Sequence, residues 1–313
     1  MKATLINKTH ISGLLYQHNL ELKTSGPNSA HPGTQFITGT IDIATDDAMI
    51  NIVPVHFTYV TAVTGKGKDN ATFKVLYDII DGKHGTVMTN GADNAAILRI
   101  DSAIGLNEFY SDRSGKEELV SVKRNEGGFV HVVAVNDDAE KDRNTFDADI
   151  IITGATRREG DDEKGTQDKV VVKGAIFDFR KALLPVEFSV TNENAMNYFE
   201  SLEASPKHPT FTRVRGRQIS EVYTTTKVEE SAFGDAEVKE YKNTRKDFVI
   251  TWAQAEPYAW DTEETILASE LVEAMTARET YLATVKQRQD EYKASKGQGA
   301  TATPTASASE FNF

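Results

Sequence analysis

Hydrophobic and polar residues alternate with a period of two along most of residues 4–253. Runs rich in Val, Ile, Thr and aromatic residues are separated by clusters of Gly, Asn, Asp and Pro, which is typical of β-strands joined by turns. Helical periodicity in this region is confined to two short segments, 71–81 and 194–204. The pattern therefore predicts a mainly β protein.

The same order of local patterns occurs twice in the chain. Ile11-Ser-Gly-Leu corresponds to Ile152-Thr-Gly-Ala, and Val53-Pro-Val-His-Phe-Thr corresponds to Leu184-Pro-Val-Glu-Phe-Ser, which one short helix follows in each copy. Each half is thus predicted to hold three strands, a helix and two more strands. A lone helix between strands three and four, with a glycine in the first strand, is the order of a five-stranded OB barrel. The sequence predicts two such barrels in tandem.

A third helical pattern is much longer. From 262 to 296, apolar side chains recur at spacings of three and four without Pro or Gly, which predicts one amphipathic helix that Asp261 or Thr262 can cap. Its apolar stripe needs a partner, either a barrel or a second copy of the chain in a coiled coil. The residues after it are mostly Gly, Ala, Thr and Ser, which predicts a flexible tail.

These patterns divide the chain into five parts. We expect a first OB-like domain at 1–135, an acidic connector at 136–149, a second OB-like domain at 150–256, a long helix at 261–296 and a tail at 297–313. The formal net charge of −12 is concentrated in and just after the connector and in the long helix. Because both barrels are close to neutral, the acidic total does not exclude a polyanionic ligand.

Several function classes lack support. The chain has no cysteine, which excludes disulfides, thiolate metal sites and a cysteine nucleophile. Its seven histidines show no metal-binding spacing, and neither a G-x-S-x-G nor a P-loop string occurs. No apolar run has the length of a signal peptide or a membrane span. We expect a cytoplasmic protein that is not an enzyme, needs no cofactor or metal and does not bind membranes.

The tandem arrangement resembles the OB-fold single-stranded DNA-binding proteins of bacteria and phages. The opening Ile6-Asn-Lys-Thr-His-Ile-Ser-Gly, followed by a hairpin and Ile41-Asp-Ile-Ala-Thr, is similar to the start of the bacterial proteins. The resemblance implies sequence-tolerant binding of single-stranded DNA during replication or recombination. It also implies that the tail tip docks on replication or recombination proteins through Glu310, Phe311 and Phe313, although this tip has fewer carboxylates than the family pattern.

An OB barrel holds a single strand by stacking bases on exposed aromatic rings and by placing Lys and Arg along the phosphates. In strand three, Val55 and Phe57 and their counterparts in the second half are apolar in both copies and are predicted to lie in the core. Strand four offers better candidates, namely Arg99 and Tyr110 in the first half and Arg213, Arg215, Arg217 and Tyr223 in the second. Alternatively, the arginines lie on a solvated face with carboxylate partners and the tyrosines close the barrels.

Strand five and the hairpins supply the remaining candidates. Cations and aromatic rings occur together around a predicted Gly127-Gly128 turn and in a predicted basic hairpin at 241–246. A pair of arginines leads into the predicted hairpin at 160–168. A solvated hairpin explains the same pattern. These candidates are Lys123, Arg124, Phe129, His131, Arg157, Arg158, Tyr241, Lys242, Arg245, Lys246 and Trp252.

Two other function classes remain open. A virion or assembly protein also uses β-barrels, and the long helix would then join subunits into a homo-oligomer without binding nucleic acid. An OB-type module for carbohydrate or protein is a further alternative, because the fold does not determine the ligand.

Overall fold

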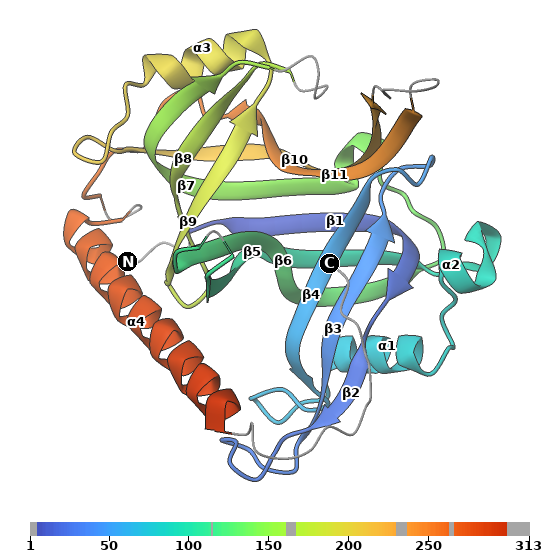
Figure 1. Cartoon of the computed structure of the whole chain (residues 1–313). Coiled ribbons are helices and arrows are strands. Elements are labelled where there is room, and N and C mark those ends of the chain that lie inside the picture. The colour runs from blue at the N-terminus through green and yellow to red at the C-terminus, as the bar shows by residue number, and fades with distance from the viewer. Residues whose placement is uncertain (1–4, 114, 161–166, 230–236, 263–265, 299–313) are drawn as a thin grey trace.

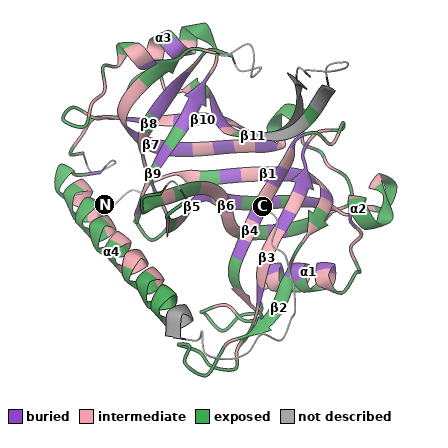
Figure 2. Ribbon diagram, viewed as in Figure 1, coloured by how far each residue is buried: buried purple, intermediate pink, exposed green. Residues whose placement is uncertain are grey.

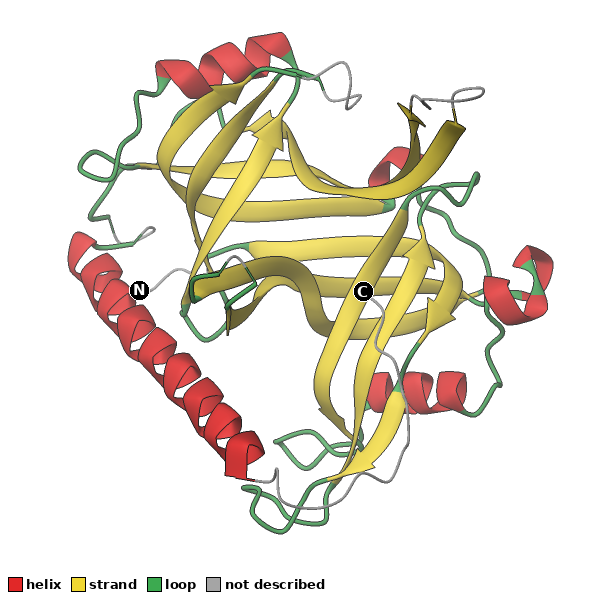
Figure 3. Cartoon of the chain, viewed as in Figure 1, coloured by secondary structure: helices red, strands yellow, loops and turns green. Residues whose placement is uncertain are grey.

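The computed structural model describes the whole chain except residues 1–4, 114, 161–166, 230–236, 263–265 and 299–313. For residues 221–229, 237–239, 241–245 and 295–298 it describes the backbone alone. Figures 1 and 3 show two β-barrels side by side, with α3 over one barrel, α1 against the other and the long helix α4 along one flank.

The first barrel follows the predicted OB order. Its strands are β1 (Asn7–His18), β3 (Gln35–Ala44), β4 (Ile52–Thr61), β5 (Ile97–Ser111) and β6 (Glu118–Val133), and the short β2 (Glu21–Thr24) pairs with β3. Antiparallel pairs link β1 to β3 and β5, β3 to β4, and β5 to β6. A parallel contact between β4 and β6 closes the barrel. Alternate apolar residues, Val55 and Phe57 among them, fill its core as predicted.

The connection between β4 and β5 holds the first predicted helix. This helix, α1 (Ala71–Ile80), begins where the Asn70 side chain accepts a hydrogen bond from the Thr72 N–H, and its Leu76 and Ile79 pack into the core. Two single-turn helices that the sequence did not predict follow it, α2 (Val87–Asn90) and η1 (Ala92–Asn94).

The second barrel repeats this topology. Its strands are β7 (Asn144–Arg158), β8 (Lys169–Phe177), β9 (Leu183–Val190), β10 (Thr210–Glu229) and β11 (Glu237–Ala253), and a parallel contact between β9 and β11 closes it. The helix α3 (Glu193–Ser201), capped by Asn192, again precedes the fourth strand. Its core contains Phe146, Phe188 and Phe248 in mutual contact. The predicted mainly β fold with two OB-like barrels is confirmed.

The first strands of the two barrels pair directly with each other. Antiparallel pairing of β1 with β7 runs from Asn7↔Ala148 to Ile11↔Asn144, so one sheet continues from barrel to barrel. Figure 2 shows buried residues along the strands on both sides of this junction. Between β6 and β7 the chain adds only a short 3-10 turn, η2 (Glu140–Asp142). Residues 144–149 of the expected connector are instead the start of β7, where Phe146 and Ala148 lie in the core of the second barrel.

Two predicted turns lie inside continuous strands. Gly127 and Gly128 adopt positive φ angles of 66° and 114° within β6 and form a bulge rather than a turn. A Cβ on Gly128 would lie 2.3 Å from the Asp101 carbonyl oxygen, so this close approach requires glycine. The predicted hairpin at 241–246 is also wrong, because these residues pair with 220–225 of β10 in the middle of the long β10–β11 ribbon.

The long helix α4 (Ala268–Gln298) begins six residues later than predicted. Asp261 still caps it, because its carboxylate accepts a hydrogen bond of 2.8 Å from the Ala268 N–H. Near its start, Leu271 packs on a small cluster with Phe177 and Phe211 of the second barrel. Further along, it contacts β5 of the first barrel. The helix therefore covers part of both barrels of its own chain.

Candidate nucleic-acid interface

The β1–β7 junction gives the two barrels a common outer surface. Residues that pair across neighbouring strands point to the same face of a sheet, so the register identifies which side chains share this surface. Both barrel cores lie on the opposite face. The residues of this outer surface, which we name the shared face, are Lys8, His10, Ser12, Arg99, Asp101, Phe129, His131, Thr145, Asp147, Arg213, Arg215, Arg217 and Trp252.

Two exposed aromatic rings lie on opposite sides of the shared face. Phe129 on β6 is 71% exposed and borders a depression of about 500 Å³ that Lys8 and His10 also line. Trp252 on β11 is 44% exposed. From β6 to β11 the path through β5, β1, β7 and β10 crosses five strand-to-strand steps. Measured along the sheet, this path is about 24 Å long.

A single carboxylate orients two of the arginines. Arg213 binds both oxygens of Asp147, at 2.7 and 2.5 Å, and Arg215 reaches the same carboxylate at 3.2 Å. The hydrogen bonds to Asp147 raise the pKa of Arg213. Arg215 also stacks on Trp252, and Arg217 donates to the Asn144 side chain at 3.0 Å. These contacts hold the guanidinium groups in place. The Asp147 carboxylate also neutralises part of the positive charge of Arg213 and Arg215.

His10 joins the sheet to the connector. Its Nδ1 lies 2.9 Å from an Asp101 oxygen and its Nε2 lies 2.9 Å from an Asp138 oxygen, which also accepts a bond from the Ser12 hydroxyl. Burial opposes protonation of the ring, but the hydrogen bonds to the two carboxylates outweigh it and raise the pKa of His10. The partly buried carboxyl of Asp138 has a lowered pKa, because the bonds from Ser12 and His10 outweigh its desolvation. The result is a hydrogen-bonded clamp beside the depression.

The family model described as YorF matches residues 6–288. The chain belongs to the YorF family. No curated protein matches it. A comparison with solved structures finds a deletion mutant of the single-stranded DNA binding protein from Thermus aquaticus, with a TM-score of 0.47 and 10% sequence identity. The match covers 83% of this chain and 98% of that chain.

Seven predicted candidates of this YorF-family chain come together on the shared face. They belong to four adjacent cross-strand rows of paired residues and come from both barrels: Arg99, Phe129, His131, Arg213, Arg215, Arg217 and Trp252. The predicted alternative, a solvated face with carboxylate partners, also describes part of this surface, since Asp147 pairs with Arg213 and Arg215.

Lys123 lies elsewhere, between the barrels. Its ammonium group donates to the Glu187 carbonyl and lies 5.2 and 5.0 Å from the ring centroids of Phe188 and Phe248. Burial lowers the pKa of Lys123 to about 8. The side chain therefore links β6 of the first barrel to the second barrel and is not on the open surface that its predicted role requires.

Other predicted cations and rings also have structural partners. Arg124 pairs with Glu126, and Arg157 binds Glu193 and Glu200 on α3. Tyr110 lies against α4, where Gln289 bonds to both its backbone N–H and its carbonyl. Two candidates remain exposed away from the shared face, Arg158 at the end of β7 and Lys246 on β11.

The remaining candidates lie outside the described side chains. They are Tyr223, Tyr241, Lys242 and Arg245 on the β10–β11 ribbon and the tail residues Glu310, Phe311 and Phe313.

Sequence reasoning missed Lys8, His10, Asp101 and Asp147. The alternation of Lys8, His10 and Ser12 in the first strand is a signal that places these polar side chains on the outer face. Within the described residues, no three His, Asp or Glu side chains are arranged to hold a metal ion. The helices in the described ranges are too short or too polar to cross a membrane.

Proposed function

We propose that this protein binds single-stranded DNA across the shared face, without strong sequence preference and without catalysis. The observation that carries the proposal is the position of two exposed rings, Phe129 and Trp252, at the two sides of a surface that holds Arg and Lys side chains between them. Bases stack on aromatic rings regardless of their identity, and cations follow the phosphates.

Each group has a defined task in this proposal. The Phe129 and Trp252 rings receive unpaired bases, whereas Lys8, Arg99 and Arg215 contact phosphates. Asp147 fixes the direction of two guanidinium groups before the strand arrives, which lowers the entropy lost on binding. Because it also neutralises part of their charge, we expect a moderate dependence of affinity on salt.

The resemblance of the opening residues to bacterial single-strand binding proteins supports a role in phage or bacterial DNA replication or recombination. In that setting the protein holds strands open while replication or recombination proteins engage them. Docking of such partners on the tail tip is part of the same proposal.

The test is a titration with fluorescent oligo-dT of about 30 nucleotides at about 50 and 300 mM salt, with duplex DNA of equal length as competitor. We expect binding to the single strand that weakens with salt and that duplex competes for poorly. Absence of binding at the lower salt concentration would overturn the proposal, and sedimentation would then show whether the chain forms the large oligomers of an assembly protein.

A further inference from the structure

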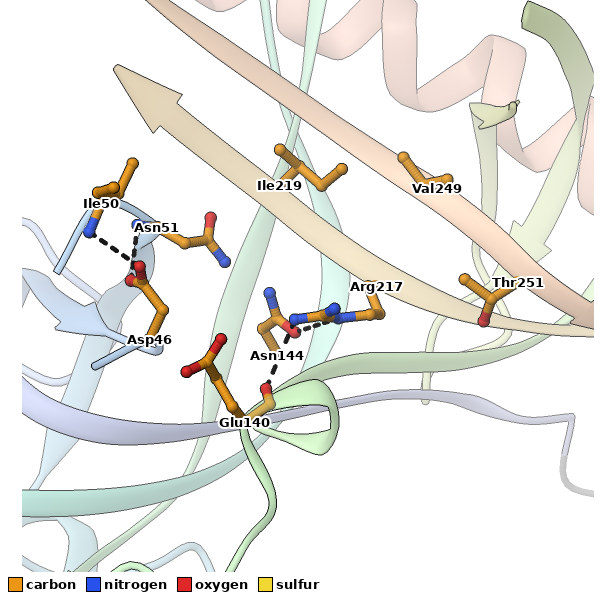
Figure 4. Close-up of a pocket in the computed structure, with 9 residues that line it drawn as sticks. All are labelled: Asp46, Ile50, Asn51, Glu140, Asn144, Arg217, Ile219, Val249 and Thr251. Carbon is orange, nitrogen blue, oxygen red and sulfur yellow. Dashed lines mark hydrogen bonds between the residues drawn. The ribbon is translucent and has the colours of Figure 1, made fainter. Parts of the chain in front are cut away.

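A second cavity lies where the two barrels face each other beside the shared face. Its volume is about 410 Å³, within the usual range for small-ligand sites. Figure 4 shows the apolar side chains of Ile50, Ile219 and Val249 along one side and the charged side chains of Glu140 and Arg217 on the other. A planar group of moderate size with polar edges matches this lining.

Hydrogen bonds between the barrels fix the walls. The Asn51 side chain accepts a 2.6 Å bond from the Ser220 N–H and donates to the Gln218 carbonyl, so the β3–β4 hairpin is attached to β10. Asp46 folds that hairpin by accepting bonds from the N–H groups of Ile50 and Asn51. Ile50 is therefore held opposite the β10–β11 ribbon although it is 52% exposed.

The charged side of the cavity is also held in place. The Arg217 Nε donates to the Asn144 oxygen at 3.0 Å, and its Nη2 lies 3.5 Å from the Glu140 carbonyl. Within the described part of the chain, Arg217 Nη1 has no hydrogen-bond partner. The Glu140 carboxylate makes one long contact of 3.5 Å, with the Asp47 N–H. A donor from Arg217 and the carboxylate oxygens of Glu140 thus remain available in the same cavity.

The charge of the cavity selects which part of a nucleotide can enter. Asp46 and Glu140 place two carboxylates near one guanidinium, and this negative excess disfavours a phosphate group. A neutral base with its ring faces against Ile50, Ile219 and Val249 meets no such penalty.

We propose that this cavity binds a guanine base of the single strand that lies on the shared face; the inference rests on the proposed function. Guanine carries two adjacent donors, N1–H and the N2 amino group, which fit the two oxygens of one carboxylate such as Glu140. Its O6, next to N1–H, is an acceptor that the free Nη1 of Arg217 can contact. None of the other three bases has an adjacent pair of ring N–H and amino donors for the carboxylate beside an acceptor for the guanidinium. Arg217 belongs to both surfaces, so a strand on the shared face reaches the cavity directly.

The experiment compares full-length protein and its Glu140→Gln variant. The probes are oligo-dT and the same strand in which well-spaced single thymines are replaced by guanine, by adenine or by cytosine. Glu140→Gln replaces one acceptor oxygen with an amino group that faces the guanine donors. Glu21→Gln, an exposed carboxylate on β2, is the matched control.

We expect the wild type to bind the guanine strand roughly tenfold more tightly than oligo-dT, as a good bidentate contact allows. Glu140→Gln removes this preference and leaves binding to oligo-dT unchanged, which also shows that the variant is folded. Equal affinity of the wild type for all four strands would overturn the guanine site and leave the proposed function intact. Failure of the wild type to bind any strand would overturn the proposed function, and the guanine site with it.

Discussion

The guanidinium group of Arg215 stacks on the indole ring of Trp252 across strands β10 and β11, with 4.8 Å between the guanidinium carbon and the ring centroid. The two residues are direct neighbours in the antiparallel register. Trp252 nevertheless keeps 44% of its surface exposed, so one part of the ring orients the arginine while another part is open to a base. An Arg–aromatic pair of this kind suits stacking and phosphate contact together.

Removal of either exposed ring should weaken single-strand binding. We expect Trp252→Ala and Phe129→Ala each to lower the affinity for oligo-dT by roughly 5- to 150-fold, because each base stacked on a ring contributes about 1–3 kcal/mol. Trp252→Phe should retain most of the affinity. The control is Phe179→Ala, which removes a ring that is 85% exposed on the β8–β9 turn. An equal loss of affinity in the control variant would show that the strand also binds at the β8–β9 turn, outside the shared face.

Asp147→Asn should strengthen binding. The change weakens the hold of one carboxylate on Arg213 and Arg215 and frees their charge for phosphates. We expect higher affinity at low salt and a salt slope that steepens by roughly 0.7 for each additional phosphate that the freed arginines neutralise. Oligo-dT titrations at several salt concentrations measure both quantities, with Asp93→Asn on the first barrel as control. A loss of affinity would show that Asp147 acts mainly by positioning the arginines.

The OB order of each half is predictable because it depends on local signals. Core-facing alternation marks Val55 and Phe57 in one half and Val186 and Phe188 in the other, and a short Asn-capped helix follows each pair. Each of these features depends on residues that are close together in the chain, so it can be recognised from one sequence alone.

The shared face is not predictable in this way. It arises from pairing of β1 with β7, and nothing in the sequence near Lys8 or Asp147 indicates which strand will lie beside it. The same reason explains Lys123, which looks like an exposed cation in a polar strand until the second barrel is placed over it. The polar stretch at 241–246 imitates a turn because the long β10–β11 ribbon lacks the clear alternation of a core strand.

The clamp at His10 should make stability depend on pH. Burial opposes its charge, but the bonds to Asp101 and Asp138 raise the pKa of His10 above 6.5 in the folded state. Protonation therefore stabilises the fold, fully below the ordinary value of 6.5 and decreasingly as the pH rises through the raised folded value. Arg99 also faces Asp138 and adds to the lowering of the pKa of that carboxyl.

The measurement compares the free energy of unfolding of the wild type and His10→Gln between about pH 5.5 and 9, on both sides of the ordinary histidine pKa. We expect a wild-type advantage at the acidic end that shrinks toward the alkaline end. A difference that stays constant across this range would show that His10 contributes by packing alone.

The attachment of α4 to the barrels should depend on one buried ion pair. Arg278 on α4 binds Glu108 on β5 with a bond of 2.5 Å, and the Glu108 side chain is only 2% exposed. Arg278→Met leaves this carboxylate buried without its cation, which typically costs about 3–5 kcal/mol. Since Gln289 and Leu271 still hold other parts of the helix, we expect lower thermal stability and faster proteolysis within α4. The double variant Arg278→Met with Glu108→Leu should recover much of the loss, because no unpaired charge remains. A single variant with unchanged stability but a changed oligomeric state would contradict this prediction. It would show that α4 forms a contact between copies of the chain and does not pack on the barrels of its own chain.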